Sequence, residues 1–178
     1  MDNDRNMELL SCFDETGNHI EPHTRKEVHE QPLKFWHAVT NIWVINSKSE
    51  ILCTHRSSIN EGNPNKWQTY VGGHVKHEDS FKETAVRELD EELGLTPDDG
   101  KLISIKEEKG EHWKHITAMF AFFWDGKAED TNAKDGEIDG AKWMSFEDYM
   151  NDFNTNPEQW CNNINHELYT DILKLKVE

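Results

Sequence analysis

Four acidic residues stand close together in VRELDEELGL, residues 86–95, with an arginine before them and a glycine after. On a helix, at about 100° per residue, Glu88, Glu91 and Glu92 share one arc of roughly 100° beside an apolar face. Like charges three or four positions apart destabilise a helix by a few tenths of a kcal/mol per pair. Mg²⁺ or Mn²⁺ would offset this repulsion, because both ions prefer carboxylate oxygens and share their remaining positions with phosphates. The pattern indicates a metal site, and its alternative is a solvated acidic face.

The residues around this stretch predict how it is positioned. Ser80, followed three residues later by Glu83, has the spacing of a capping box and predicts a helix that begins there. Gly94 predicts the end of the helix, with apolar Leu95 after it. Gly72 and Gly73 lie one loop before the helix. We therefore expect a glycine-containing loop to lead directly into an acidic helix.

The remaining pattern predicts a mixed sheet with helices packed on it. Residues 7–20 predict a short N-terminal hairpin around the turn 14–18, and Pro32 breaks the connector that follows. Residues 36–46 and 50–57 predict a second hairpin, and 115–126 is apolar enough to be a central strand. Further strands are expected at 67–71, 102–109 and 141–145, a polar loop at 127–140, and helices at 146–153 and 164–176.

Length and charge limit the function classes. The chain has 178 residues and a formal charge of -16, which fits one domain or one domain with an extension. Strong negative charge disfavours nucleic acid as a partner, so an anionic substrate needs bound cations or a local basic pocket. The absence of a long apolar run and of paired cysteines predicts a protein of the cytoplasm with reduced thiols and no membrane partner.

The spacing around the acidic helix resembles the Nudix box. The matching residues are Gly73, Asp79, Arg87, Glu88, Leu89, Glu91, Glu92, Gly94 and Leu95. One position departs from the family pattern, since Asp79 stands where glutamate is usual. The shorter side chain keeps its charge, and the Arg-Glu-x-x-Glu-Glu part is intact.

This resemblance implies a fold, a reaction and a set of site residues. It implies an α+β Nudix fold, with a mixed sheet sandwiched between helices, over residues 35–178, preceded by a hairpin extension and connector over 1–34. The implied reaction is hydrolysis of a nucleoside diphosphate linked to another group, with Mg²⁺ or Mn²⁺. The implied metal ligands are Gly72, through its carbonyl, Glu88, Glu91, Glu92 and the loop acid Glu137, with Glu111 as the second choice for that loop acid. Arg87 would orient a glutamate, and one glutamate would act as the base.

Substrate contacts are predicted from single residues. Arg56 and Lys66 precede the glycine loop and are candidates for phosphate contacts, although each could equally be a solubilising charge. His37 and His74 are further candidates for the substrate site. Trp36, Trp67 and Trp113 could stack on a nucleobase, or fill the core and cover sheet edges.

A closer resemblance, over most of the chain, is to the branch that contains isopentenyl-diphosphate isomerase. His29, His37 and His74 match metal-binding histidines of that enzyme and could bind a second metal. However, Gly72 replaces its loop cysteine, and His115 falls about where its catalytic glutamate should be, so the proton transfers have no carrier. Hydrolysis is therefore favoured over an isomerase and over a silent nucleotide-binding module. The hairpin and the exposed aromatic residues are compatible with a homodimer.

Overall fold

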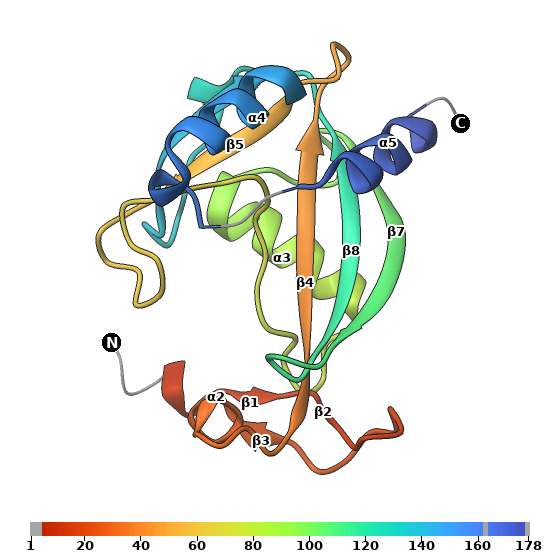
Figure 1. Cartoon of the computed structure of the whole chain (residues 1–178). Helices are drawn as coiled ribbons and strands as arrows, with labels where there is room; N and C mark the ends of the chain where they lie inside the picture. Colours follow the sequence, from red (N-terminus) through yellow and green to blue (C-terminus); the bar gives the residue numbers. More distant parts are fainter. Residues whose placement is uncertain (1–4, 162–163, 177–178) are drawn as a thin grey trace.

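A mixed β-sheet forms the centre of the molecule (Figure 1). The structure is a computed structural model, and it describes residues 5–161 and 164–176. In this part of the chain the sheet has the order β6-β5-β4-β8-β7, with β2 also paired to β4 and β9 to β5. The strands are β2 (Cys12–Phe13), β4 (Trp36–Ile45), β5 (Ile51–Arg56), β6 (Trp67–Gln68), β7 (Lys101–Gly110), β8 (His115–Phe123) and β9 (Ile138–Met144).

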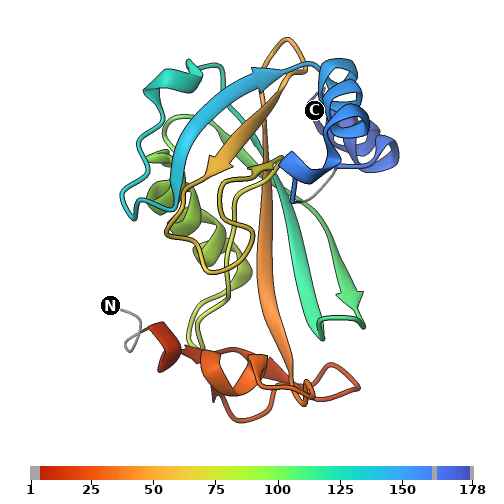
Figure 2. The same ribbon diagram turned by 60° about the vertical axis from the view of Figure 1, so that its left-hand side comes forward.

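Strand β4 explains why helices cover both faces of the sheet. Its side chains alternate, so Ile42 and Val44 belong to one buried cluster whereas Trp43 and Ile45 belong to another. The first cluster packs against α3 (Phe81–Leu93). The second packs against α4 (Phe146–Thr155) and α5 (His166–Leu175). Figure 2 shows α3 on one side of the sheet and α4 and α5 on the other, which confirms the predicted sandwich.

The two edges of β4 have different neighbours. Along one edge β8 runs parallel to it, from His37↔His115 to Ile45↔Phe123. This places β8 between β4 and β7, as its apolar sequence predicts. Along the other edge β5 pairs only at Ile45↔Ile51, so the expected second hairpin separates at once. The glycine loop occupies the vacated edge, through the bridges Ile42↔Val71 and Val39↔His74.

Helix α3 begins and ends where its capping residues predict. The Ser80 hydroxyl accepts a hydrogen bond from the Glu83 N–H, and the Glu83 carboxylate accepts one from the Ser80 N–H. Gly94 follows the last turn as the C-cap. Leu89 and Leu93 are buried against the sheet, so the helix is fixed at its ends and along one face.

The N-terminal extension contains the expected turn but is more than a hairpin. Residues 14–18 form the turn, and Phe13 forms a bridge with His19. The strand β1 (Leu9–Leu10) pairs with β3 (His23–Thr24), while Cys12 of β2 joins the main sheet opposite His37. The helix α2 (Arg25–His29) lies in the segment predicted to be only a connector. Short 3-10 turns at Ala128–Asp130 and Pro157–Gln159 complete the described elements.

No helix in the described part of the chain combines the length and the apolar character that crossing a membrane requires.

The cap of α3 gives a first test. Ser80→Ala removes the side-chain acceptor of the Glu83 N–H, so we expect it to lower the free energy of unfolding by about 1 kcal/mol. For a domain of this size that corresponds to a drop of about 2–4 °C in Tm, measured by calorimetry. Ser145→Ala removes the equivalent hydrogen bond at the N-terminus of α4 and is the matched control, which should lower Tm by a similar amount. An unchanged Tm for Ser80→Ala alone would contradict this account of the helix start.

Candidate active site

The glycine loop lies directly over the acidic face of α3. The Gly72 N–H donates to Glu92 Oε1 at 2.8 Å. A side chain at Gly73 would place its Cβ 2.3 Å from Glu88 Oε1, and one at Gly72 would place it 2.0 Å from the Thr40 carbonyl oxygen. Gly72 also has φ +153°, a backbone conformation that favours glycine. Two glycines are therefore needed for the loop to fit between β4 and the carboxylates.

Glu88 and Glu92 are buried by this packing. Their exposed fractions are 8% and 4%. Burial raises the pKa of both carboxyl groups. The charge of Glu91 adds to the shift of Glu88, and the charge of Glu88 adds to the shift of Glu92. Glu91 is different, since 42% of its side chain is exposed. A cation that reached the buried pair, Glu88 and Glu92, would stabilise their charged forms.

Arg87 holds the acidic face together. Its Nη1 donates to Glu88 Oε1 at 2.8 Å and to Glu91 Oε2 at 3.0 Å. Its Nη2 donates to the carbonyl oxygen of His74 at 3.3 Å, and its Nε lies 3.6 Å from Asp79 Oδ2. Asp79 thus retains contact with this arginine although it is one methylene shorter than the usual glutamate. A single guanidinium links the helix, the glycine loop and the loop acid.

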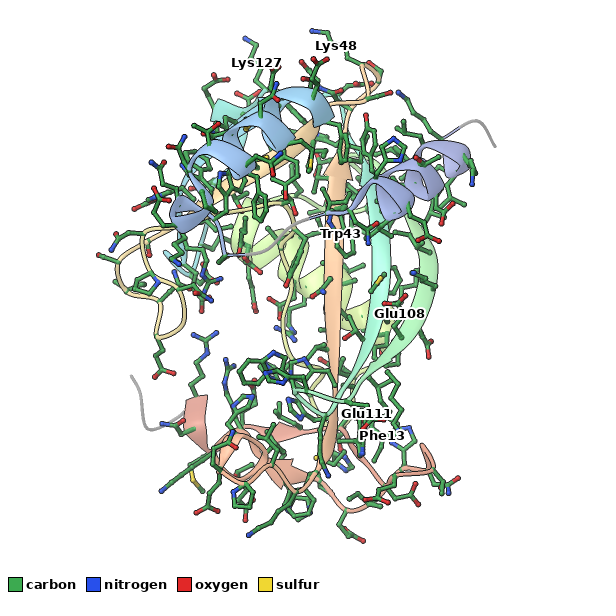
Figure 3. All side chains as sticks on the ribbon, viewed as in Figure 1. Phe13, Trp43, Lys48, Glu108, Glu111 and Lys127 are labelled. Carbon is green, nitrogen blue, oxygen red and sulfur yellow. The ribbon has the colours of Figure 1, made fainter. Side chains whose placement is uncertain are left out.

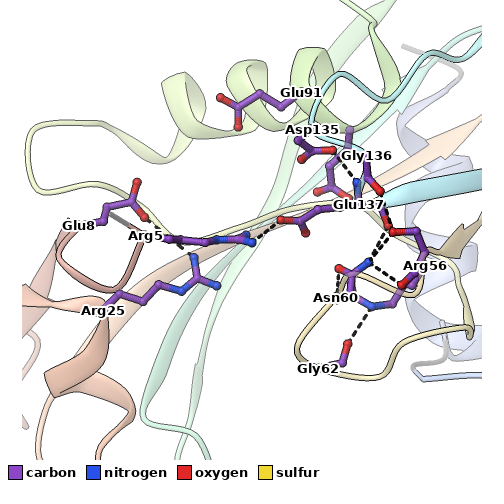
Figure 4. Close-up of polar contacts among 12 residues, drawn as sticks. Arg5, Glu8, Arg25, Arg56, Asn60, Gly62, Glu91, Asp135, Gly136 and Glu137 are labelled. Atoms are coloured by element: carbon purple, nitrogen blue, oxygen red, sulfur yellow. Dashed lines mark hydrogen bonds and ion pairs between the residues drawn. The ribbon is translucent and has the colours of Figure 1, made fainter. Parts of the chain in front are cut away.

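The loop before β9 contributes two more acids. Figure 4 shows Asp135 and Glu137 beside α3, with Glu91 above them. The Glu137 N–H donates to Asp135 Oδ1 at 2.9 Å, and the carbonyl of Glu137 accepts from the side-chain amide of Asn60 at 2.7 Å. The structure therefore brings Glu137 to the Nudix-box face, where Asp135, which the sequence analysis did not single out, joins it.

These residues line one large cavity of about 890 Å³. Glu88 and Glu91 line it, and Glu92 lies behind them under Gly72. Among the predicted phosphate contacts, Arg56 lines the cavity and Lys66 does not. Glu111 lies on the turn between β7 and β8 (Figure 3) and is not among the lining residues.

None of the three tryptophans considered for base stacking lines the cavity. Trp36 is buried in the core and Trp113 is exposed on the turn before β8. Trp67 packs near Trp160, with Lys142 Nζ 4.0 Å above its ring. Among the phenylalanine, tyrosine and tryptophan residues that the structure describes, the one that lines the cavity is Tyr70.

Four histidines meet at the end of the cavity nearest the N-terminal extension. They are His29 from α2, His37 from β4, His74 from the glycine loop and His115 from β8. Each offers a ring nitrogen within 4.8 Å of the others, and the Nε2 atoms of His29 and His74 are 3.1 Å apart. The sequence placed His115 near the position of the isomerase glutamate and outside the predicted histidine set, and its membership of the cluster follows from its pairing with His37.

The electrostatics of this histidine cluster favour neutral rings. Burial, followed by the proximity of other cationic groups, lowers the pKa of each ring, to about 3 for His37 and to about 4 for His115. His37 is fully buried, and neither of its ring nitrogens has a hydrogen-bond partner of good geometry among the described residues, although the backbone of Phe35 lies near enough to raise the pKa of the ring slightly. A buried ring nitrogen without a partner is unfavourable unless something else occupies its lone pair. His37 therefore lies too deep to contact a substrate directly, whereas His74 lines the cavity.

Comparison with known proteins identifies the class to which this site belongs. The NUDIX domain family matches residues 35–162, most of the chain. An uncharacterized Nudix hydrolase of Clostridium acetobutylicum is 34% identical over 129 residues, covering 68% of this chain and 61% of that protein. This chain thus spans less than two thirds of the length of that relative. The chain belongs to the Nudix family.

Two further likenesses concern the branch and the fold. An isopentenyl-diphosphate delta-isomerase of Saccharopolyspora erythraea is 25% identical over 163 residues, covering 87% of this chain and 82% of that one. The crystal structure of DR0079 from Deinococcus radiodurans superposes with a TM-score of 0.73 at 18% identity, covering 94% of this chain and 98% of that one. The second likeness confirms the predicted Nudix fold.

The buried position of Glu92 leads to a prediction about stability. Because burial raises the pKa of Glu92, the folded state favours the protonated carboxyl group. Its stabilising contribution is fully present below the pKa of the unfolded state, about 4.3, and is lost as pH rises through the pKa of the folded state. In chelator, Glu92→Gln should therefore unfold at a higher temperature than the wild type at pH 8, by about 2–4 °C, and the difference should shrink at pH 5. The exposed Glu129→Gln is the control, and Tm by calorimetry is the measurement. A variant less stable than the wild type at pH 8 would contradict the conclusion that the buried carboxylate of Glu92 destabilises the metal-free fold.

Proposed function

We propose that this protein catalyses metal-dependent hydrolysis of a phosphoanhydride bond in a nucleoside diphosphate linked to another group. One observation carries the proposal: Glu88 and Glu92 are buried as neighbours beneath the glycine loop, where their repulsion is offset only in part by Arg87. A purely structural helix face would gain from replacing them. Their burial as a pair beside a large cavity, with Glu88 at its wall, is explained by ligand binding.

The donor set fits Mg²⁺ or Mn²⁺. Both ions prefer carboxylate and carbonyl oxygens, and the site offers Glu88, Glu91, Glu92 and Glu137 together with the Gly72 carbonyl. When bound, such an ion supplies charge neutralisation for the diphosphate and a lowered pKa for a coordinated water. Glu88 and Glu91 line the cavity and are the carboxylates that meet the substrate side. Arg87 keeps both of them oriented, since one of its nitrogens donates to each.

The isomerase alternative lacks its proton carriers at the expected positions. Gly72 carries no side chain, and His115 belongs to the histidine cluster. Cys161 lines the same cavity, but it lies beside Gln68 at the far side of the sheet order from β8, and burial raises the pKa of its thiol. Conversion of isopentenyl diphosphate into dimethylallyl diphosphate would support the isomerase over the hydrolase.

We also propose that the histidine cluster binds a transition metal such as Zn²⁺. Neutral imidazoles suit Zn²⁺, Co²⁺ or Ni²⁺ and are poor ligands for Mg²⁺. In a tetrahedral zinc site the nitrogens are about 3.3 Å apart, close to the separation already present between His29 and His74. Such an ion would also occupy the unpartnered nitrogen of His37. The role of this metal would be to fasten the N-terminal extension to the sheet.

Three predictions of the sequence concern the whole protein. A cytoplasmic location and a homodimer are kept as part of this proposal, together with a small phosphorylated substrate. Sedimentation of the purified chain tests the second of them.

The carboxylate site makes a prediction about turnover. Glu91→Gln removes a charge that faces the cavity, and we expect kcat/KM with Mg²⁺ to fall at least about 100-fold, a loss of about 2.7 kcal/mol of transition-state stabilisation. A screen of nucleotide sugars, dinucleoside polyphosphates and nucleoside di- and triphosphates supplies the substrate.

Asp90→Asn is the matched control on the same helix. Asp90 pairs with Lys134 on the outer side of α3 and does not line the large cavity, so we expect activity close to that of the wild type. Equal losses in the two variants, or undiminished turnover in Glu91→Gln, would refute the assigned site.

The histidine cluster makes a prediction about metal content. After chelator treatment, the full chain should bind one equivalent of Zn²⁺ in the presence of excess Mg²⁺, measured by native mass spectrometry. At 100 times its Kd the ion should add about 2.7 kcal/mol to the free energy of unfolding. His115→Ala should lose the binding, and His112→Ala, on the neighbouring turn, should keep it. Equal zinc binding by both variants would contradict the proposed site.

A further inference from the structure

The wall of the large cavity opposite the acids carries three arginines from separate segments. Arg5 and Arg25 come from the N-terminal extension, and Arg56 ends β5. All three line the large cavity and also a smaller adjoining one of about 470 Å³. Figure 4 shows Arg5 and Arg25 side by side, with Arg56 across from them. In a chain of net charge -16, three guanidinium groups gather at one site, and Glu61 and Glu137 line both cavities beside them.

Within the described part of the chain, Arg56 is held in place without an ion pair. Its Nε donates to the carbonyl of Gly62 at 3.1 Å, and its two terminal nitrogens donate to Gln68 Oε1 at 3.1 Å and Asn60 Oδ1 at 2.6 Å. All three acceptors are neutral, so they orient the guanidinium and leave its charge uncompensated. A guanidinium has five N–H groups, and two of them remain for a ligand.

Arg25 is largely buried and weakly paired. Only 20% of its side chain is exposed. Among the described residues, the one carboxylate within 4.0 Å is that of Glu8, at 3.9 Å, and Glu8 also lies 3.1 Å from Lys76 Nζ. A buried cation with so distant a counter-ion is unfavourable unless an anion binds it.

Arg5 is the one member of the three with a close carboxylate. Its Nη1 lies 2.5 Å from Oε1 of Glu137. Glu137 is also the loop acid proposed as a metal ligand, so the same carboxylate has two competing partners. If Glu137 turned toward a metal, the guanidinium of Arg5 would lose its counter-ion. Arg5 and Arg25, which line the same cavity, could then bind one anion together.

We propose that Arg5, Arg25 and Arg56 form an anion site for a terminal phosphate monoester of the substrate, and that Glu137 occupies Arg5 until metal binds. The inference rests on the proposed function and narrows its substrate class. The group attached to the diphosphate ends in a phosphate, as in a nucleoside triphosphate, rather than in a neutral sugar. A terminal phosphate carries a charge of about -1.5 to -2 at pH 7, and its oxygens match the fork of an arginine, so three arginines suit it better than a diester.

The ion pair between Arg5 and Glu137 makes the site conditional. Without metal, Arg5 is paired with Glu137, so of the three arginines Arg25 and Arg56 are available to the phosphate. With metal bound to Glu137, all three arginines are available. Binding of the metal and of the terminal phosphate should therefore reinforce each other, as two ligands linked through one shared carboxylate.

The first experiment measures binding without turnover. Inorganic pyrophosphate is titrated into the full chain in excess chelator and followed by calorimetry. We expect Arg25→Gln to weaken binding about 10-fold or more, and Glu137→Gln to strengthen it about 10-fold because Arg5 is released. The double variant Arg5→Gln, Glu137→Gln should lose that gain.

Two controls separate specific contacts from the general field. Lys66→Gln removes the same charge as Arg25→Gln, from a residue outside both cavities, and should leave the affinity within about twofold. Asp135→Asn removes a neighbouring carboxylate that does not pair with Arg5, and should give a much smaller gain than Glu137→Gln. Equal effects of Arg25→Gln and Lys66→Gln, or a gain in Glu137→Gln that survives the loss of Arg5, would overturn the proposal.

A second experiment identifies the source of the phosphate. With Mg²⁺, Arg25→Gln should raise KM for a nucleoside triphosphate about 10-fold more than KM for a nucleotide sugar. If pyrophosphate binding falls while both KM values change equally, the site serves free phosphate, and the assignment to the substrate is overturned. Because the calorimetry requires no hydrolysis, failure of the proposed reaction and failure of this anion site give different results.

Discussion

Burial of two carboxylates beneath a backbone loop is the constraint on which the rest of this structure depends. Glu88 and Glu92 lie under Gly72 and Gly73, close enough that a side chain at either glycine would collide with a carboxylate or with β4. This arrangement requires α3 to be fixed along its apolar face and at both ends, since a small rotation would expose the acids. The capping box and the buried leucines provide that rigidity.

The separation of β4 from β5 creates the space for this arrangement. A regular hairpin would have filled the edge of β4 with β5, but the two strands pair at one position only. The glycine loop then pairs with β4 instead, through Val71 and His74. The same strand thus positions the loop on one edge and, through its parallel partner β8, a histidine on the other. The cavity opens where β5 diverges, which brings Arg56 and the loop of Glu137 to its far wall.

Local sequence signals predicted the parts of the site that lie within one segment. The start and end of α3, the need for glycines and the acidic arc all follow from spacing within residues 71–95. The histidine cluster and the arginine wall could not be predicted in the same way, because they combine segments far apart in the chain. The helix α2 was missed because it is short and precedes a proline, although Thr24 and Glu27 have the spacing of a capping box, and the structure shows that box formed. That signal would have placed His29 at the end of a helix.

The N-terminal extension supplies what the acidic core lacks. The core contributes the carboxylates, whereas the extension contributes two arginines and one histidine to the same cavity end. The backbone of His74 connects the two sets of groups, since its carbonyl accepts from Arg87 while its ring belongs to the histidine cluster. An ion held by the histidines would fix that carbonyl, and through Arg87 it would fix the orientation of Glu88 and Glu91. The extension therefore affects the acidic site through position as well as through charge.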